Sequence, residues 1–231
     1  MAARFEELDF QQTALGEISL RRRYDLTAQV DLYEVRLGEE FLMSSLFTVA
    51  ERALAALALD RLDRDGCRVL VGGLGLGYTA HTALTDPRVA ALTVMDAAEP
   101  VLDWHRRGLL PEVAELATDP RCHLVLRDFF AYAAGEPDSG YDAILLDVDH
   151  TPRHVLHPSH ADFYTVTGLQ ALRRHLTAGG VFALWSDDPP DAEFTEVLAA
   201  VFADSASEVV TFANPLTGGE SSNTIYLATA R

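Results

Sequence analysis

The chain has 231 residues, 48% hydrophobic and 23% charged, a composition typical of soluble globular proteins and a length sufficient for one domain with a proper core. An excess of 35 acidic over 18 basic residues gives a formal net charge of −17, which would repel a phosphate backbone, so we expect no nucleic-acid partner. No segment reaches the ~20 uncharged apolar residues of a membrane span, and the first residues lack the apolar core of a signal peptide, so we expect a cytoplasmic protein without membrane contact.

The first residues differ from the rest of the chain by the period-two alternation of short strands. The alternation is clearest at residues 17–21, 29–36 and 40–43. We expect two or three strands that form a small β-appendage, residues 1–45, ahead of a larger domain, residues 46–231. From Ser45 to Ala58 the apolar residues recur at helical spacing, with Ser44 or Ser45 as the N-cap.

Downstream of this helix, apolar strands alternate with helices. The strands are expected at residues 68–72, 89–96, 122–127, 141–147 and 181–185. Helices are expected near 99–105, 162–176 and 191–202, with Gly179 and Gly180 ending the second one. Two terminal strands, near 208–212 and 224–228, are expected to pair in antiparallel fashion. Near-continuous apolar strands that alternate with helices indicate a parallel sheet covered on both faces.

The strand at 68–72 runs directly into a glycine-rich turn. Gly73, Gly75 and Gly77 allow backbone or ligand to approach where a Cβ would clash, and residues 78–84 are expected to begin a helix. A strand, a glycine turn and a helix N-terminus together form a site for the polar part of a nucleotide. The pattern Gly-x-Gly-x-x-Ala that starts at Gly75 also fits dinucleotides, so an NAD-binding oxidoreductase stays open.

Acidic residues follow one strand after another in this region. They are Asp96, Asp128, Asp147 and the pair Asp187 and Asp188. Ligands of parallel sheets bind at the carboxyl ends of the strands, and carboxylates gathered there need a partner of opposite charge.

Two of these acids suit a nucleoside. Asp96 can accept hydrogen bonds from both ribose hydroxyls, or it can cap the helix that begins near Glu99. Asp128, which precedes Phe129 and Phe130, can accept an adenine amino proton while a ring packs on the base, or it can cap a short helix.

With these segments the chain resembles the spermidine synthase-like proteins, relatives of the polyamine aminopropyltransferases within the class I S-adenosylmethionine (SAM)-dependent methyltransferase superfamily. The resemblance covers roughly residues 30 to 230. Its carriers are the glycine turn at 69–77, Val94-Met-Asp96, Arg127-Asp128, the strand 141–147, Phe163-Tyr164, and residues 176–184. The resemblance implies an α/β, Rossmann-like class I methyltransferase fold with a mostly parallel seven-stranded sheet, and a homodimer.

The resemblance also implies a reaction. Asp147 would lie beside the electrophilic carbon of SAM or decarboxylated SAM, where an aspartate orients an incoming amine and helps to remove its proton. The sulfonium is itself the leaving group, so no metal is expected. The acceptor would be a small, cationic amine, surrounded by Asp149, His150 and Tyr164 and by the pair Asp187 and Asp188.

Two departures from the family pattern leave the acceptor open. The Asp-x-x-Asp-Pro motif of polyamine synthases is replaced by Asp147-Val-Asp149-His150-Thr-Pro152, and the Tyr-His-Glu segment is represented by residues 48–51. Methyl transfer with Asp147, Asp149 or His150 as base therefore stays open, as does a noncatalytic nucleotide-binding module.

The loop 149–160 holds four of the eight histidines of the chain. Pro152 and Pro158 prevent the regular helix that would align these histidines, so we interpret the loop as a polar lid rather than a metal site. Cys67 and Cys122 are expected to be free thiols inside the fold.

Overall fold

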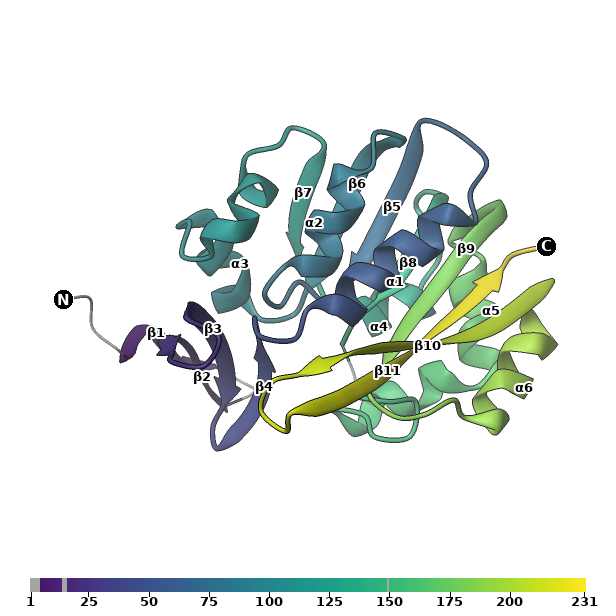
Figure 1. Cartoon of the computed structure of the whole chain (residues 1–231). Helices are drawn as coiled ribbons and strands as arrows, with labels where there is room; N and C mark the ends of the chain where they lie inside the picture. The colour runs from purple at the N-terminus through teal and green to yellow at the C-terminus, as the bar shows by residue number, and fades with distance from the viewer. Residues whose placement is uncertain (1–4, 14–15, 149) are drawn as a thin grey trace.

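The computed structural model describes residues 5–13, 16–148 and 150–231. Within these ranges the chain forms a four-stranded sheet and a seven-stranded sheet (Figure 1). The strands of the larger sheet are β5 (Cys67–Gly72), β6 (Val89–Asp96), β7 (Cys122–Leu126), β8 (Tyr141–Leu146), β9 (Leu176–Ser186), β10 (Asp204–Asn214) and β11 (Gly219–Thr229). This larger sheet confirms the α/β architecture that was expected from the sequence.

The order of strands in the larger sheet is β10-β11-β9-β8-β5-β6-β7. The pairs from β9 through β7 are all parallel, whereas β11 is antiparallel to both of its neighbours. The chain builds outward from β5 to β7 and then returns to place β8 on the other side of β5. The strand order therefore reverses between β5 and β8, and such a reversal leaves a crevice at the carboxyl ends of these strands.

Helices cover both faces of this sheet. They are α1 (Val49–Asp60), α2 (Tyr78–Thr85), α3 (Glu99–Arg106), α4 (Phe129–Ala134), α5 (Val166–Arg173) and α6 (Ala192–Val201). Alternate residues of β5 serve two separate cores: Val69 and Val71 pack with α1, α2 and α3, and Leu70 packs with α4, α5 and α6. In the described ranges no helix has the length and apolar character needed to span a bilayer.

The N-terminal sheet consists of β1 (Phe5–Thr13), β2 (Gly16–Asp25), β3 (Val30–Leu37) and β4 (Glu40–Ser44). The sequence predicted two or three strands and missed β1. This strand is mostly exposed and pairs with β2 partly through ion pairs, such as Arg22 Nη2 to Glu6 Oε2 at 2.6 Å, so it lacks a clear apolar alternation. Trp104 Nε1 of α3 donates to Asp9 Oδ2 at 2.8 Å and so fastens β1 to the larger domain.

The expected bounds of two helices are wrong, including the start of α5, which is Val166 rather than residue 162. Helix α1 begins at Val49 rather than Ser45, because the Ser45 hydroxyl accepts the Tyr33 amide at 2.9 Å and so belongs to the N-terminal sheet. Helix α5 ends at Arg173, and Gly179 and Gly180 lie inside β9. They accommodate a shift in the pairing of β9 with β8, where a Cβ on Gly180 would lie 3.0 to 3.2 Å from three backbone oxygens.

Candidate active site

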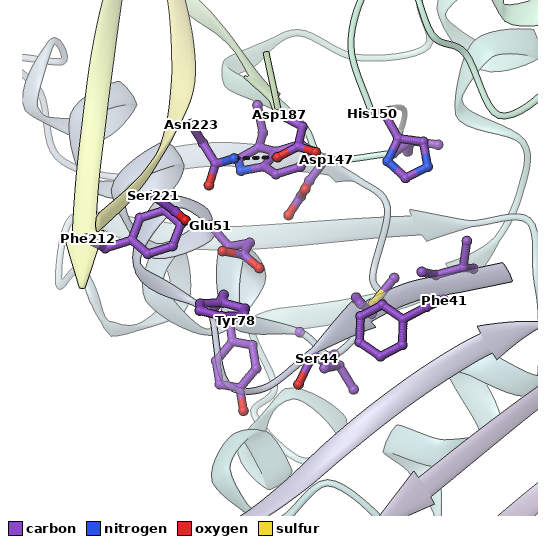
Figure 2. Close-up of a pocket in the computed structure, with 18 of the residues that line it drawn as sticks. Phe41, Ser44, Glu51, Tyr78, Asp147, His150, Asp187, Phe212, Ser221 and Asn223 are labelled. Atoms are coloured by element: carbon purple, nitrogen blue, oxygen red, sulfur yellow. Dashed lines mark hydrogen bonds between the residues drawn. The ribbon is translucent and has the colours of Figure 1, made fainter. Parts of the chain in front are cut away.

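A cavity of about 510 Å³ lies at the carboxyl ends of β5, β8 and β9, beside the reversal of strand order. Its walls come from segments far apart in sequence, and Figure 2 shows ten of their residues by name. The glycine turn and the first turns of α1 and α2 form one side. Residues of β4, the loops after β8 and β9, and the far end of the β10–β11 hairpin form the rest.

The glycine turn contacts this cavity through Gly75 and Gly77. Gly75 has a φ of +46°, and a Cβ there would lie 2.8 Å from Met43 Sδ of β4. Gly73 has a φ of +93°, and a Cβ there would overlap the backbone carbonyl oxygen of Asp147. The turn therefore needs glycine both for its left-handed backbone and for close approach to two neighbouring segments.

Asp96 lies directly behind the turn. Its carboxylate accepts the Leu74 amide at 2.9 Å and the Ala98 amide at 2.8 Å. Burial raises the pKa of Asp96 above its ordinary value, although the hydrogen bonds from backbone amides oppose this shift. Asp96 thus shapes the turn. It is not one of the described residues that line the cavity. Its predicted contact with a ribose stays a prediction.

Asp128 is the N-cap of α4. Its Oδ1 accepts the amides of Phe130 at 2.8 Å and Ala131 at 3.2 Å, as the capping alternative predicted. Asp128 is exposed and follows β7, which is two strands away from β5. Its contact with an adenine stays a prediction.

Asp147 follows β8 and lines the cavity, so the strand predicted to lead to this residue places it beside the glycine turn. The Thr79 hydroxyl of α2 donates to Asp147 Oδ2 at 2.7 Å. Burial raises the pKa of Asp147 to about 6, and this hydrogen bond opposes the shift. A carboxyl with a pKa near neutrality suits proton transfer.

Glu51 of α1 lines the same cavity, and its carboxylate lies near Asp147 in Figure 2. Burial, and then the negative charge of Asp147, raise the pKa of Glu51 to about 8. The sequence pattern did not predict a role for Glu51. The available signal was the family's Tyr-His-Glu segment, of which only the glutamate is kept here.

His150 and Asp187 also line the cavity, and they are joined to each other through the backbone. The Asp187 amide donates to the His150 carbonyl at 2.7 Å. The Asp187 side chain accepts Asn223 Nδ2 of β11 at 2.8 Å, and His150 Nε2 lies 3.5 Å from Glu40 Oε1. These contacts hold the loops after β8 and β9 together over the cavity.

The remaining expected acceptor residues lie elsewhere. Tyr164 is buried in the core, where its ring packs against Phe163 and Phe194. Asp188 lines a separate cleft, and its Oδ2 lies 3.4 Å from His154 Nδ1. Asp149 lies outside the residues that the structure describes.

The four histidines of the loop after β8 do not gather at one point, although the rings of His157 and His160 lie 5.9 Å apart. His150 faces the cavity and His154 pairs with Asp188, whereas His157 Nδ1 accepts the Ser159 amide and the His160 ring stacks on Phe130 with centroids 3.7 Å apart. Within the described part of the chain, no three His, Cys, Asp or Glu residues gather in a way that could hold a metal ion.

The sequence did not predict two of the cavity walls. Phe41 and Met43 come from the N-terminal sheet, and Phe212 and Asn223 come from the terminal hairpin. The Phe47 and Phe212 rings lie 5.8 Å apart and connect the two ends of the chain beside the cavity. No local motif marks these residues, because each reaches the cavity only through the packing of its element.

His105 of α3 supports the glycine turn from the side. Its Nε2 donates to the Gly75 carbonyl at 2.9 Å, and Nδ1 is buried without a partner among the described residues. Burial lowers the pKa of His105 below its ordinary value of 6.5, so the folded protein holds this ring in its neutral form.

We expect the free energy of unfolding to fall as the pH drops below about 6.5, because the unfolded chain takes up a proton at His105 that the folded chain does not. The His105→Gln variant keeps an NH donor for Gly75 and should show a shallower fall in urea unfolding between about pH 5 and 7. His123→Gln, at an exposed position, is the matched control. Equal slopes in both variants and the wild type would contradict the role of His105.

Comparison with known proteins supports the fold and the motifs. Residues 51–215 match the family profile described as the spermine/spermidine synthase domain. Polyamine aminopropyltransferase 2 of Pseudomonas aeruginosa is 30% identical over 145 residues, which are 58% of this chain and 39% of that protein. Polyamine aminopropyltransferase of Prochlorococcus marinus is 30% identical over 154 residues, 65% of this chain and 50% of that protein. The chain thus spans half or less of the length of these relatives.

A third relative is named for another activity. Putrescine N-methyltransferase 3 of Nicotiana tabacum is 32% identical over 80 residues, 35% of this chain and 21% of that protein. Among solved structures, spermidine synthase from Thermotoga maritima has a TM-score of 0.77 at 18% identity and covers 97% of this chain and 73% of its own. This likeness confirms the expected methyltransferase-like fold.

Proposed function

The chain belongs to the spermine/spermidine synthase domain family, and from this we propose that it is a transferase that moves an aminopropyl group from decarboxylated SAM to a small amine. Two of the relatives named above are polyamine aminopropyltransferases, which supports this reaction. The expected homodimer and cytoplasmic location stay predictions.

The charge of the cavity carries the proposal. Glu51, Asp147 and Asp187 line it, and none of its described lining residues is an arginine or a lysine. SAM carries a carboxylate on the arm attached to its sulfonium, and decarboxylated SAM does not. Carboxylates in a partly dry cavity attract ammonium and sulfonium groups and repel another carboxylate, so the cavity favours the decarboxylated donor and a cationic acceptor.

Asp147 is the base in the reaction that we propose. A protonated amine has no lone pair, so it must first give a proton to Asp147. Thr79 holds Asp147 Oδ2, and we assign Oδ1 to the amine. The nitrogen lone pair then forms a bond to the carbon beside the sulfonium while the carbon–sulfur electron pair stays on sulfur. A neutral thioether leaves, and the proton passes from Asp147 to solvent.

The other expected site residues take roles on either side of this centre. Gly73, Gly75 and Gly77 would bind the donor beside Asp147. Asp96 ends β6 and Asp128 follows β7, so an adenosine that extends from the glycine turn along the strand ends would reach them in that order.

Residues on the far side of Asp147 would bind the acceptor. His150 and Asp187 line the cavity there, with Asp149 in the same loop as His150. Tyr164 would support this region from the core, and Asp188 would contribute its negative charge from the neighbouring cleft.

Methyl transfer from SAM is the second candidate, because a putrescine N-methyltransferase is among the relatives. It would use the same base and the same type of acceptor, and only the donated group would differ.

Binding and product analysis separate the candidates. By isothermal titration we expect decarboxylated SAM to bind at least about tenfold more tightly than SAM, a difference of about 1.4 kcal/mol, and NAD not to bind. Incubation with a panel of amines should give products that are heavier by one aminopropyl group in mass spectrometry. Products heavier by one methyl group, formed with SAM, would support the second candidate. Saturable binding of NAD alone, without any alkylated amine, would contradict both.

A further inference from the structure

Glu51 lies in the first turn of α1 with its side chain in the cavity, opposite the end of β8 (Figure 2). One hydroxyl group connects it with Asp147. Thr79 Oγ1 lies 2.7 Å from Asp147 Oδ2 and 3.2 Å from the Glu51 carbonyl oxygen. Thr79 is buried, so the helix turn that carries Glu51 is held at a fixed position relative to Asp147. Both side chains line the cavity, and Figure 2 shows their carboxylates near each other.

The described surroundings of Glu51 do not neutralise its charge. Asp147 faces it from the end of β8 and Tyr78 from α2. Among the described residues, the cation that acts on Glu51 is Arg52, its neighbour in α1, and the Arg52 guanidinium lies over the Tyr78 ring at 4.9 Å. Two buried carboxylates of like charge are unfavourable unless one holds a proton or a cation lies between them. Burial, and then the negative charge of Asp147, raise the pKa of Glu51, whereas the raised pKa of Asp147 comes from burial.

We propose that Glu51 binds the primary ammonium group of a substrate and so forms, with Asp147, a two-carboxylate clamp for a cation. The inference rests on the proposed function, in which both substrates carry such a group. The ammonium belongs either to the aminopropyl arm of the donor or to the acceptor amine. In the first case Glu51 also repels the carboxylate of SAM and decides which donor is used.

The Glu51→Gln variant tests the clamp, with the exposed Glu208→Gln as matched control. Decarboxylated SAM is titrated alone, and putrescine is titrated in the presence of the thioether product 5′-methylthioadenosine. We expect Glu51→Gln to lose at least about tenfold in affinity in one of these two titrations, and the titration that changes identifies the source of the ammonium. Glu208→Gln should match the wild type in both.

Two further readouts distinguish binding from a structural role. The pKa of Glu51 is about 8 in the empty protein, so at about pH 7.5 wild-type binding should release a proton into the buffer, and Glu51→Gln should lose most of this release. In the folded protein this raised pKa makes wild-type stability fall as the pH rises from about 4.5 to 8. Empty Glu51→Gln should therefore melt at a higher temperature than the wild type at pH 8, whereas a residue with a structural role would lower the melting temperature.

The outcomes distinguish a failure of the clamp from a failure of the proposed function. Wild-type binding of decarboxylated SAM, with unchanged affinities for both ligands in Glu51→Gln, would overturn the clamp and leave the proposed function in place. A lower melting temperature for Glu51→Gln with unchanged affinities would do the same. Wild-type protein that binds neither decarboxylated SAM nor putrescine would overturn the proposed function and the clamp with it.

Discussion

Replacing Asp147 with asparagine should lower kcat for alkyl transfer by about 10²- to 10⁴-fold, the usual contribution of a general base, while the donor still binds, more weakly if its ammonium group lies between Glu51 and Asp147. Asparagine keeps the shape of the side chain and an oxygen that can accept the Thr79 hydroxyl, but it cannot take a proton from the amine. Single-turnover assays with decarboxylated SAM, together with titration calorimetry, measure the two effects separately.

A matched variant and a pH profile complete this test. Asp103→Asn removes an acid from the surface of α3, outside the cavity, and should keep wild-type activity. The pKa of Asp147 is about 6, so wild-type kcat/KM should fall as the pH drops through about 6 and the base becomes protonated. Activity of Asp147→Asn within about tenfold of the wild type would remove Asp147 from the role of base.

Replacing Gly73 with alanine should destabilise the protein by about 2–5 kcal/mol and abolish donor binding. The φ of +93° disfavours any residue with a Cβ, and this Cβ would also overlap the Asp147 backbone, which lies across the crevice between β5 and β8. Relief of the overlap requires the two strand ends to separate, and this movement displaces Asp147 from the glycine turn.

Gly218→Ala measures the backbone part of this effect, so the difference between the two variants gives the steric part. Gly218 has a similarly positive φ of +71°, but a Cβ there meets nothing within 4 Å, so we expect a loss of only about 1–2 kcal/mol. Urea unfolding of both variants gives the difference. Equal losses of stability would show that the close approach at Gly73 is less restrictive than the structure indicates.

The site also suggests why this chain departs from the usual polyamine synthase motifs. The changed segment Asp147 to Pro152 places His150 at the cavity, and Glu51 is the residue kept from the Tyr-His-Glu segment. In the proposed site, the donor side, with its glycine turn and Asp147, keeps the family pattern. We therefore expect the acceptor, rather than the donor, to distinguish this protein from its relatives.

Much of the fold follows from local patterns in the sequence. Apolar runs at 68–72, 89–96 and 141–147 predicted β5, β6 and β8, since a strand buried on both faces needs apolar side chains on both. The glycine turn and Asp147 were also predictable. The carboxyl ends of neighbouring parallel strands lie at the same edge of the sheet. A turn at the end of one strand and an acid at the end of its neighbour must therefore meet there.

Other local choices could not be decided from neighbouring residues. Asp128 fitted both an adenine contact and a helix cap, and the structure shows the cap. Gly179 and Gly180 fitted a helix end, but they lie in β9, because the need for a shift in strand pairing arises only when β8 is beside it. Strand β1 was missed because polar, ion-paired strands lack the alternation that identifies a strand.

The sequence by itself determined the sheet, the glycine turn and the acid that faces it, because each depends on residues close together in the chain. Only the tertiary structure brought Glu51 to Asp147, Met43 to Gly75 and Phe212 to Phe47. These contacts join helices, strands and the two ends of the chain across the edge of the sheet. The charge and shape of the cavity depend on which elements pack there, and packing is decided by the whole core rather than by any single segment.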